Sequence, residues 1–355
     1  MPSLPKFRLL VSLFAVAALL AALPAAAQAT LVFTRNPMNP VVFKANDNGS
    51  GVQRIGSGYN PRISPDGQTI VFFRGGNGRS QKPLLMAVPT AGGSVRTLAK
   101  GWQSSSVFDW SADSTRIAIT IGPELGRQNL TVIDVADGKQ TRIASGYFNG
   151  VSFAPEGNES LVYGRAPNEN YPPRTDLWRI DLLPPGAVSV AAVQPRRLTT
   201  DRRSQSPLWG PNDTIVFVRL LGDKQRKYGP KNELFKMNSA GAAVSRLTHT
   251  RVDALTFGLT PTAWSTSGNQ LLAEYGGQDT SYAVAVNPAN GRERTLTNER
   301  EIGFIGTALS RDGRTVLGWQ GGFEPGPNHR VVSIPYAGGR PTVLVRNATE
   351  PDWDR

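Results

Sequence analysis

The chain has 355 residues, of which 39% are apolar and 19% charged, and 39 basic against 27 acidic side chains give a net charge of +12. It contains no cysteine, which excludes disulfide bonds, thiol chemistry and cysteine-based zinc sites. The positive charge favours anionic surroundings, such as acidic polysaccharide, acidic lipid headgroups or an acidic protein. The alternative is that this charge only keeps the protein soluble.

Residues 1–29 have the pattern of a secretory signal peptide. Lys6 and Arg8 precede the uncharged apolar run 9–23, and Ala25–Ala29 offers small residues at the −3 and −1 positions of a cleavage site. The run is shorter than the roughly 20 residues that a membrane-spanning helix needs. We therefore predict export to the periplasm or the extracellular space, with no stable membrane insertion and no nucleic-acid partner. An uncleaved membrane anchor is the alternative.

One short phrase recurs along the rest of the chain. Ser64-Pro65-Asp66-Gly67 lies between two apolar segments, and degenerate copies begin at Ser111, Ala154, Gly210, Ser265 and Ser310. The intervals between these first residues are 47, 43, 56, 55 and 45. Strand-rich repeats of this length are typical of propeller blades.

Each repeat contains four predicted strands. The first ends at the recurring phrase. The second is apolar on successive residues, as in a strand that is covered on both faces. These second strands are expected at 70–73, 116–120, 161–165, 215–219, 271–275 and 316–320. The third strands are expected at 84–88, 130–135, 177–182, 234–237, 283–286 and 331–334. The fourth strands share a basic and then aliphatic ending, and are expected at 95–98, 141–143, 196–199, 245–248 and 294–297.

The two ends of the chain complete each other. Segments 31–35, 41–45 and 52–55 resemble the last three strands of a unit, and 351–353 resembles its missing first strand. Pairing them would remove exposed sheet edges. We therefore predict an all-β propeller of four-stranded antiparallel blades over residues 30–355, closed by pairing of the N- and C-terminal strands. Seven blades are expected, and six is the alternative.

At Ser64–Arg74, and in its arginine–leucine–threonine strand endings, the sequence resembles the TolB-type, WD-repeat-like propeller family over about residues 31–353. The family includes the periplasmic propeller of the Tol-Pal envelope system and the propeller domains of prolyl-oligopeptidase-type peptidases. The resemblance implies a propeller fold. We expect neither the N-terminal domain of the former nor the peptidase domain of the latter.

The expected binding site lies on one face of the disc. Antiparallel strands place the tight turns on one face and the longer connections on the other, and binding usually occurs on such connections. The basic and aromatic residues predicted to form an anion- and ring-binding rim on this long-loop face are Arg74, Arg79, Lys82, Trp102, Tyr147, Arg202, Arg203, Lys224, Arg226, Lys227, Tyr228 and Lys231. A solvated basic loop is the alternative.

These features predict a monomeric binding scaffold for an envelope protein or an anionic cell-surface polymer, without cofactor or metal. A short peptide of an envelope protein, docked in the channel, is a further possibility. The chain has only two histidines and no Gly-x-Ser-x-Gly elbow.

The alternative function is a hydrolase or lyase with its active site at the channel mouth. Its carboxylate pair would come from Asp109, Glu124 or Asp279, by analogy with glycoside chemistry. His249 with Asp253 is a second set of candidates, on a variable connection.

Overall fold

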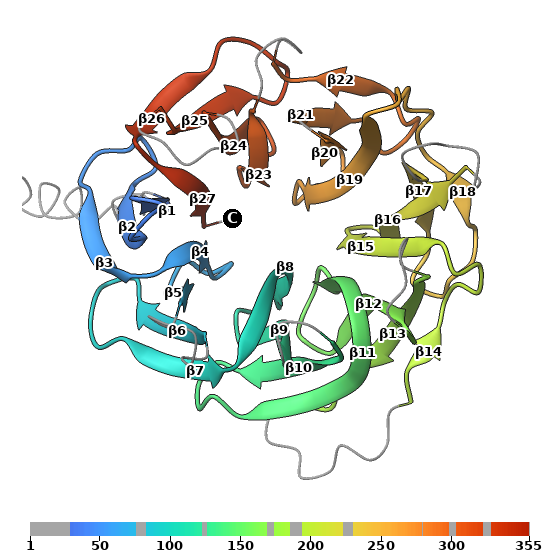
Figure 1. Cartoon of the computed structure of the whole chain (residues 1–355), viewed down its shortest axis with the longest axis horizontal. Helices are drawn as coiled ribbons and strands as arrows, with labels where there is room; N and C mark the ends of the chain where they lie inside the picture. The colour runs from blue at the N-terminus through green and yellow to red at the C-terminus, as the bar shows by residue number, and fades with distance from the viewer. Residues whose placement is uncertain are drawn as a thin grey trace, which may run out of the picture.

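The computed structural model describes residues 29–75, 83–122, 126–168, 174–184, 194–222, 230–278, 280–297, 303–321 and 328–354. Its 27 described strands form antiparallel sheets arranged round a central axis (Figure 1). The predicted all-β propeller is therefore confirmed. Within the described ranges no helix has the length and apolar character needed to cross a membrane.

Hydrogen-bonded pairing groups the described strands into five sheets, of four, seven, eight, four and four strands. We describe the strands in successive groups of four, called blades 1 to 7, and β11 contributes to two of these groups. Blade 1 contains β27 (Thr349–Trp353), β1 (Thr30–Arg35), β2 (Val41–Asn46) and β3 (Gln53–Ser57). Blade 2 contains β4 (Tyr59–Ile63), β5 (Thr69–Arg74), β6 (Leu84–Pro89) and β7 (Arg96–Lys100). Blade 3 contains β8 (Trp102–Trp110), β9 (Arg116–Gly122), β10 (Gln128–Asp134) and the first half of β11 (Gln140–Phe153).

Blade 4 contains the second half of β11, β12 (Ser160–Ala166), β13 (Asp176–Asp181) and β14 (Arg196–Arg197). Blade 5 contains β15 (Ser204–Gly210), β16 (Thr214–Leu221), β17 (Lys231–Met237) and β18 (Ser245–Arg246). Blade 6 contains β19 (Thr256–Trp264), β20 (Leu271–Gly277), β21 (Ser281–Val286) and β22 (Glu293–Thr295). Blade 7 contains β23 (Ile305–Leu309), β24 (Thr315–Gln320), β25 (Arg330–Pro335) and β26 (Thr342–Arg346).

The ring closes through the pairing of β1 with β27, as the sequence predicts. Leu31 lies opposite Trp353 and Val32 opposite Asp352 in this antiparallel pair. The Trp353 indole Nε1 also donates a hydrogen bond of 3.2 Å to the carbonyl of Leu309 in blade 7. The C-terminal strand thus joins both the N-terminal strand and the preceding blade, which leaves no open edge at the junction.

The hydrophobic core lies between the blades, and the second strands supply both of its sides. On β5, Val71 and Phe73 pack into a cluster with residues of blade 3. Ile70 and Phe72, which point to the opposite face, pack into a cluster with Val32 of blade 1. Burial on both faces is the reason that these strands are apolar on successive residues rather than on alternate ones.

Basic residues of third and fourth strands tie four of the blades to the next one. Arg196 donates to the carbonyl of Ser239 at 2.9 Å, and Lys236 donates to the carbonyl of Pro288 at 3.0 Å. Arg96 and Arg294 make the corresponding bonds to the carbonyls of Val135 and Tyr336. Part of the positive charge is therefore engaged within the fold.

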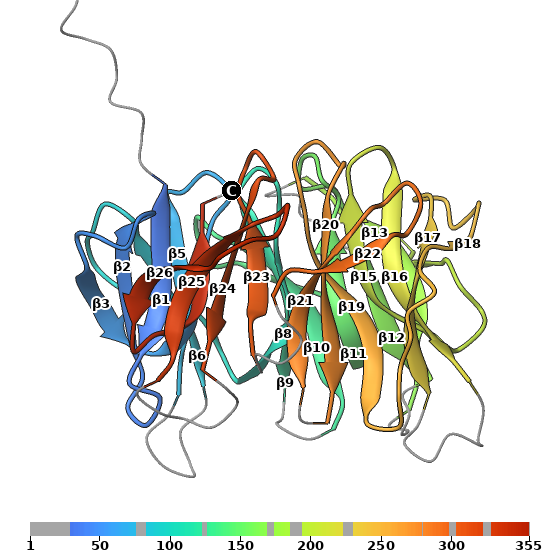
Figure 2. The same cartoon turned by 90° about the horizontal axis from the view of Figure 1, so that it is seen from above.

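The recurring phrase forms the turn between the first and second strands. In its intact copy, the Ser64 N–H donates to the Thr69 carbonyl and the Gly67 N–H donates to the Ser64 carbonyl, each at 2.8 Å. Figure 2 views the blades edge-on. Because consecutive strands of a blade are antiparallel, the turns between first and second strands and those between third and fourth strands lie on one face of the disc, and the remaining connections lie on the other. We refer to the face formed by the tight turns as the turn face.

Candidate functional site

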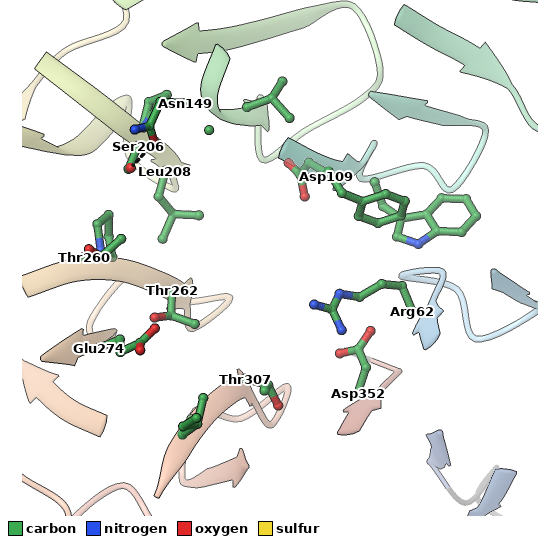
Figure 3. Close-up of a pocket in the computed structure, with 18 of the residues that line it drawn as sticks. Arg62, Asp109, Asn149, Ser206, Leu208, Thr260, Thr262, Glu274, Thr307 and Asp352 are labelled. Carbon is green, nitrogen blue, oxygen red and sulfur yellow. Dashed lines mark hydrogen bonds between the residues drawn. The ribbon is translucent and has the colours of Figure 1, made fainter. Parts of the chain in front are cut away.

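A cavity of about 580 Å³ lies on the propeller axis (Figure 3). Residues from the first strand of every blade line it, because these strands surround the axis (Figure 1). Its volume is within the range of roughly 300–1,000 Å³ that is usual for ligand sites. We call it the axial cavity.

Each first strand carries a register shift in its pairing with the second strand. Asn60, Ser206 and Glu350 adopt positive φ angles of 49°, 48° and 52° at equivalent places, and Gly150 does so at 83°. Such β-bulges bend a strand and re-aim the side chains that follow them. The bulges therefore determine which residues face the axis.

Four charged side chains line the axial cavity. Arg62 points inward from β4, with the Asp352 carboxylate beside it and Asp109 across from it, whereas Glu274 lies on the opposite wall (Figure 3). One guanidinium and three carboxylates thus face a common space in a chain whose net charge is +12. The sign of the charge at this site is opposite to that of the whole protein.

The carboxylates are held in place by hydrogen bonds. Asp352 Oδ2 accepts the N–H of Ile63 at 3.0 Å, and Asp109 Oδ2 accepts the N–H of Phe153 at 2.7 Å. Glu274 accepts a hydrogen bond from the hydroxyl of Ser281. Because these bonds fix the side chains before any ligand arrives, the arrangement is suited to selective binding.

Neutral polar groups complete the lining. The Ser206 hydroxyl donates to Asn149 Oδ1 at 2.8 Å, and Asn149 Nδ2 donates to Gln205 Oε1 at 3.1 Å. Thr260 and Thr262 border Glu274 (Figure 3). The axial cavity therefore offers hydrogen-bond donors and acceptors from several blades.

Five residues of the predicted rim lie in the described part of the chain. Arg74 donates to the Ser57 carbonyl at 3.3 Å and lies 5.9 Å from the Phe72 ring centre. Arg202 and Arg203 are exposed, and Tyr147 is half-buried. Arg79, Lys82, Lys224, Arg226, Lys227 and Tyr228 lie outside the described residues, as does the side chain of Trp102.

The fifth, Lys231, is engaged in a buried ion-pair cluster that the sequence did not indicate. Its Nζ lies 2.7 Å from Oε2 of Glu233, whose side chain is fully buried, and Arg246 lies 2.7 Å from the same oxygen. Burial alone would raise the pKa of Glu233, but hydrogen bonds from Lys231, Thr248, the Thr250 N–H and Arg246 hold it below its ordinary value.

A second carboxylate adjoins this cluster. The Thr250 hydroxyl donates to Glu293 Oε1 at 2.8 Å and also lies 3.2 Å from Glu233 Oε1. Burial raises the pKa of Glu293, and the nearby negative charge of Glu233 raises it further. The cluster links blade 5 to blade 6 by a hydroxyl placed between two carboxylates.

The candidate catalytic residues are dispersed. Asp109 faces the axial cavity, whereas Glu124 and Asp279 lie outside the described residues. His249 is exposed, and the Asp253 carboxylate accepts the N–H of Leu255. His329 is buried, with its ring centre 5.3 Å from that of Trp319. In the described ranges, no group of three or more His, Cys, Asp or Glu side chains could hold a metal ion.

Sequence reasoning missed Arg62, Glu274 and Asp352. Alignment of the repeats could have indicated two of them. Arg62 and Asp109 stand two residues before the first position of the recurring turn, and Asp352 takes the equivalent place in the C-terminal strand. Glu274 comes from a second strand, β20, and its position in the repeat does not indicate where its side chain points.

Comparison with solved structures identifies the fold. TolB from Acinetobacter baumannii superposes with a TM-score of 0.53 at 15% identity, covering 96% of this chain and 70% of that one. The β-propeller domain of the trilobed protease from Pyrococcus furiosus gives 0.59 at 12% identity, with 90% and 94% covered. An oligogalacturonate lyase from Vibrio parahaemolyticus gives 0.55 at 11% identity, with 90% and 85% covered.

No protein-family model and no curated protein matches the sequence. At identities this low, structural likeness establishes architecture rather than activity. The chain therefore has a TolB-like β-propeller fold, an architecture that it shares with a TolB protein, a protease domain and a lyase.

Proposed function

We propose that this protein is an exported binding scaffold of the cell envelope, which takes a peptide segment of a partner protein into its axial cavity. The observation that carries the proposal is the set of fixed charges, in which Arg62 faces Asp109, Asp352 and Glu274 across one space. A segment with a basic side chain and free backbone amides would match these carboxylates and the surrounding hydroxyl and amide groups. The TolB-like fold supports a role in the envelope.

Affinity capture from an envelope extract of the source organism would test this role. The bait is the mature chain, residues 30–355. It is compared with an Arg62→Gln/Glu274→Gln variant of the axial cavity and with an Arg202→Gln/Arg203→Gln control on the exposed surface. A protein retained in high salt by the wild type and the control, but lost with the cavity variant, would support the proposal. Equal retention by all three baits would contradict it.

Recognition of an anionic cell-surface polymer by the long-loop face is the second binding mode. It rests on the predicted rim, in which Arg202 and Arg203 are exposed. A Lys224→Gln/Arg226→Gln/Lys227→Gln variant should then lose glycan or lipid that the wild type retains only in low salt, because exposed charges are screened at high ionic strength. Retention that does not depend on these residues would exclude this rim.

A hydrolase or lyase is the second candidate function, since Asp109, Glu274 and Asp352 share one cavity and a lyase shares the fold. Carboxylates so placed could supply a general acid and base. If activity toward an anionic oligosaccharide is detected, Glu274→Gln should abolish it while leaving the fold intact. If the wild type has no such activity and the Arg62→Gln/Glu274→Gln variant loses envelope-protein capture, the scaffold role would be favoured.

Export is part of the proposal. If a signal peptide is cleaved after Ala27 or Ala29, the protein recovered from the envelope fraction should begin at Gln28 or Thr30, as determined by mass spectrometry. A protein that still begins at Met1 and sediments with membranes would indicate an anchor instead.

A further inference from the structure

A second cavity, of about 380 Å³, lies on the turn face between blades 5 and 6. Three tight turns form it: the turn between β15 and β16, the turn between β19 and β20, and the turn between β21 and β22. We call it the turn-face pocket. It shares no lining residue with the axial cavity.

An aromatic ring forms part of the turn-face pocket. Trp264 is half-buried, and its Nε1 donates to the Leu208 carbonyl of blade 5 at 3.4 Å. The indole lies directly against the backbone of Gly210, where an added Cβ would come within 2.3 Å of the ring. The ring is therefore fixed in position before any ligand binds.

Amide and hydroxyl groups surround the ring. Asn212, Asn269, Asn287 and Thr214 line the turn-face pocket, and the amides of the three asparagines are exposed. Asn287 Oδ1 accepts the N–H of Ala289 at 2.9 Å, which fixes the orientation of that amide. Each amide combines two donors with an acceptor, so the group can pair with hydroxyls in either sense.

The pocket lacks acidic groups where other blades have them. The third residue of the recurring turn is Asp66, Asp113, Glu156 or Asp312 in four blades, but Asn212 and Ser267 in the two that border the pocket. The fourth residue of the blade 5 turn, Asp213, is acidic, but it does not line the pocket and accepts the Ser239 N–H at 3.1 Å. Its charged lining residue is Lys236, whose ammonium donates to the Pro288 carbonyl at 3.0 Å.

The first residue of the turn differs as well. In blade 3, the Ser111 hydroxyl donates to the Asp113 carboxylate at 2.7 Å and thereby closes the turn. In blade 5, the residue equivalent to Ser111 is Gly210, so Asn212 has no such hydroxyl to bind. Its amide instead lines the pocket.

We infer that the turn-face pocket binds a neutral saccharide. A fixed indole can stack on the C–H face of a sugar ring, and amides and a hydroxyl can bond its hydroxyl groups. The described lining of the pocket has no carboxylate that would favour a cation, and the ammonium of Lys236 is already hydrogen-bonded. This inference goes beyond the proposed scaffold role and concerns a separate site on the opposite face from the long loops.

The test is titration of the mature chain with cellobiose, maltose, lactose and chitobiose, followed by ligand-observed NMR. We expect binding of at least one disaccharide. Asn269→Ala should weaken it by roughly twofold to tenfold, the range for loss of one hydrogen bond. Asn269→Trp should abolish it, because the larger side chain would fill the pocket.

Gln68→Ala provides the matched control, because Gln68 occupies the same repeat position in blade 2 and lines neither cavity. It should bind as the wild type does, as should Arg62→Gln in the axial cavity. Absence of binding to all four sugars, or equal binding by the wild type and Asn269→Trp, would overturn the inference. Thermal unfolding of each variant would show that it is folded.

Discussion

Asp352 and Ile63 are 289 residues apart in the sequence, yet the Asp352 carboxylate accepts the Ile63 N–H at 3.0 Å. The same repeat position accepts the same kind of bond elsewhere: Asp109 accepts the Phe153 N–H, and the Ser152 hydroxyl oxygen accepts the Trp209 N–H. One side-chain position thus links the first strands of blades 1 and 2, of blades 3 and 4, and of blades 4 and 5. At blades 1 and 3 it also supplies negative charge to the axial cavity.

Replacement of this carboxylate should weaken the ring at its closure. Asp352→Ala leaves the buried N–H of Ile63 without its acceptor, so we expect the free energy of unfolding to fall by about 1.5–3 kcal/mol. Denaturant unfolding would measure the loss. Asp352→Asn keeps an acceptor oxygen and should lose less. An alanine variant as stable as the wild type would show that the bond contributes nothing.

Two turn glycines differ in how closely they approach a neighbouring blade. Gly291 has a φ of 72°, and a Cβ there would lie 1.6 Å from the carbonyl oxygen of Leu247, the residue that follows β18 in blade 5. Gly157 has a similar φ of 70° but has nothing within 4 Å.

Gly157→Ala should therefore cost only the backbone term of about 1–2 kcal/mol. Gly291→Ala should cost a further 1–3 kcal/mol or so, because a blade must shift to relieve the contact. Thermal unfolding of the two variants side by side would measure the difference. Equal losses would mean that the turn moves freely relative to blade 5.

The two carboxylates of the buried cluster should respond oppositely to substitution. Glu233→Gln removes the partner of Lys231 and Arg246 and should destabilise the protein at pH 7 by about 3–5 kcal/mol, as is usual when a buried ion pair is broken. Glu293→Gln keeps an acceptor for Thr250 and removes a carboxylate whose pKa is raised, so stability at pH 7 should stay equal or rise.

The pH dependence of stability follows from the directions in which folding shifts the pKa values of these two carboxylates. The pKa of Glu233 is lowered by folding, so its contribution to stability is present above its ordinary value of 4.5 and is lost as the pH falls through the lower folded pKa. The pKa of Glu293 is raised, so its contribution is present below 4.5 and is lost as the pH rises through the folded pKa. Unfolding measured between pH 3 and 7 would test both; parallel curves for wild type and variants would refute them.

Ring closure should depend on the last tryptophan. Trp353 is 7% exposed and packs with Leu31 and Phe33. Trp353→Ala should reduce the free energy of unfolding by about 3–5 kcal/mol, the usual cost of removing a large buried side chain. Trp353→Phe keeps most of the packing and loses the hydrogen bond to Leu309, so its loss should be smaller. Urea unfolding of both variants would establish the order. Equal losses would mean that the hydrogen bond, which both variants lack, matters more than the packing.

The sequence by itself determined the strands, the recurring turn and the closure by β27. These depend on burial periodicity and turn chemistry within one repeat, and both are visible in Thr69–Arg74 and Ser64–Gly67. It also indicated Asp109 as a channel residue.

Only the tertiary structure decided what lies across a blade boundary. Arg62 and Asp352 share the axial cavity because bulges in their first strands aim side chains at the axis, and the size of such bends is not encoded in spacing. Glu274 reaches the same cavity from the second strand β20. The sequence predicts Lys231 on the basic rim, and only the structure shows its ion pair with the buried carboxylate of Glu233. The turn-face pocket likewise needs turns of two blades to adjoin, and this depends on blade packing rather than on any single repeat.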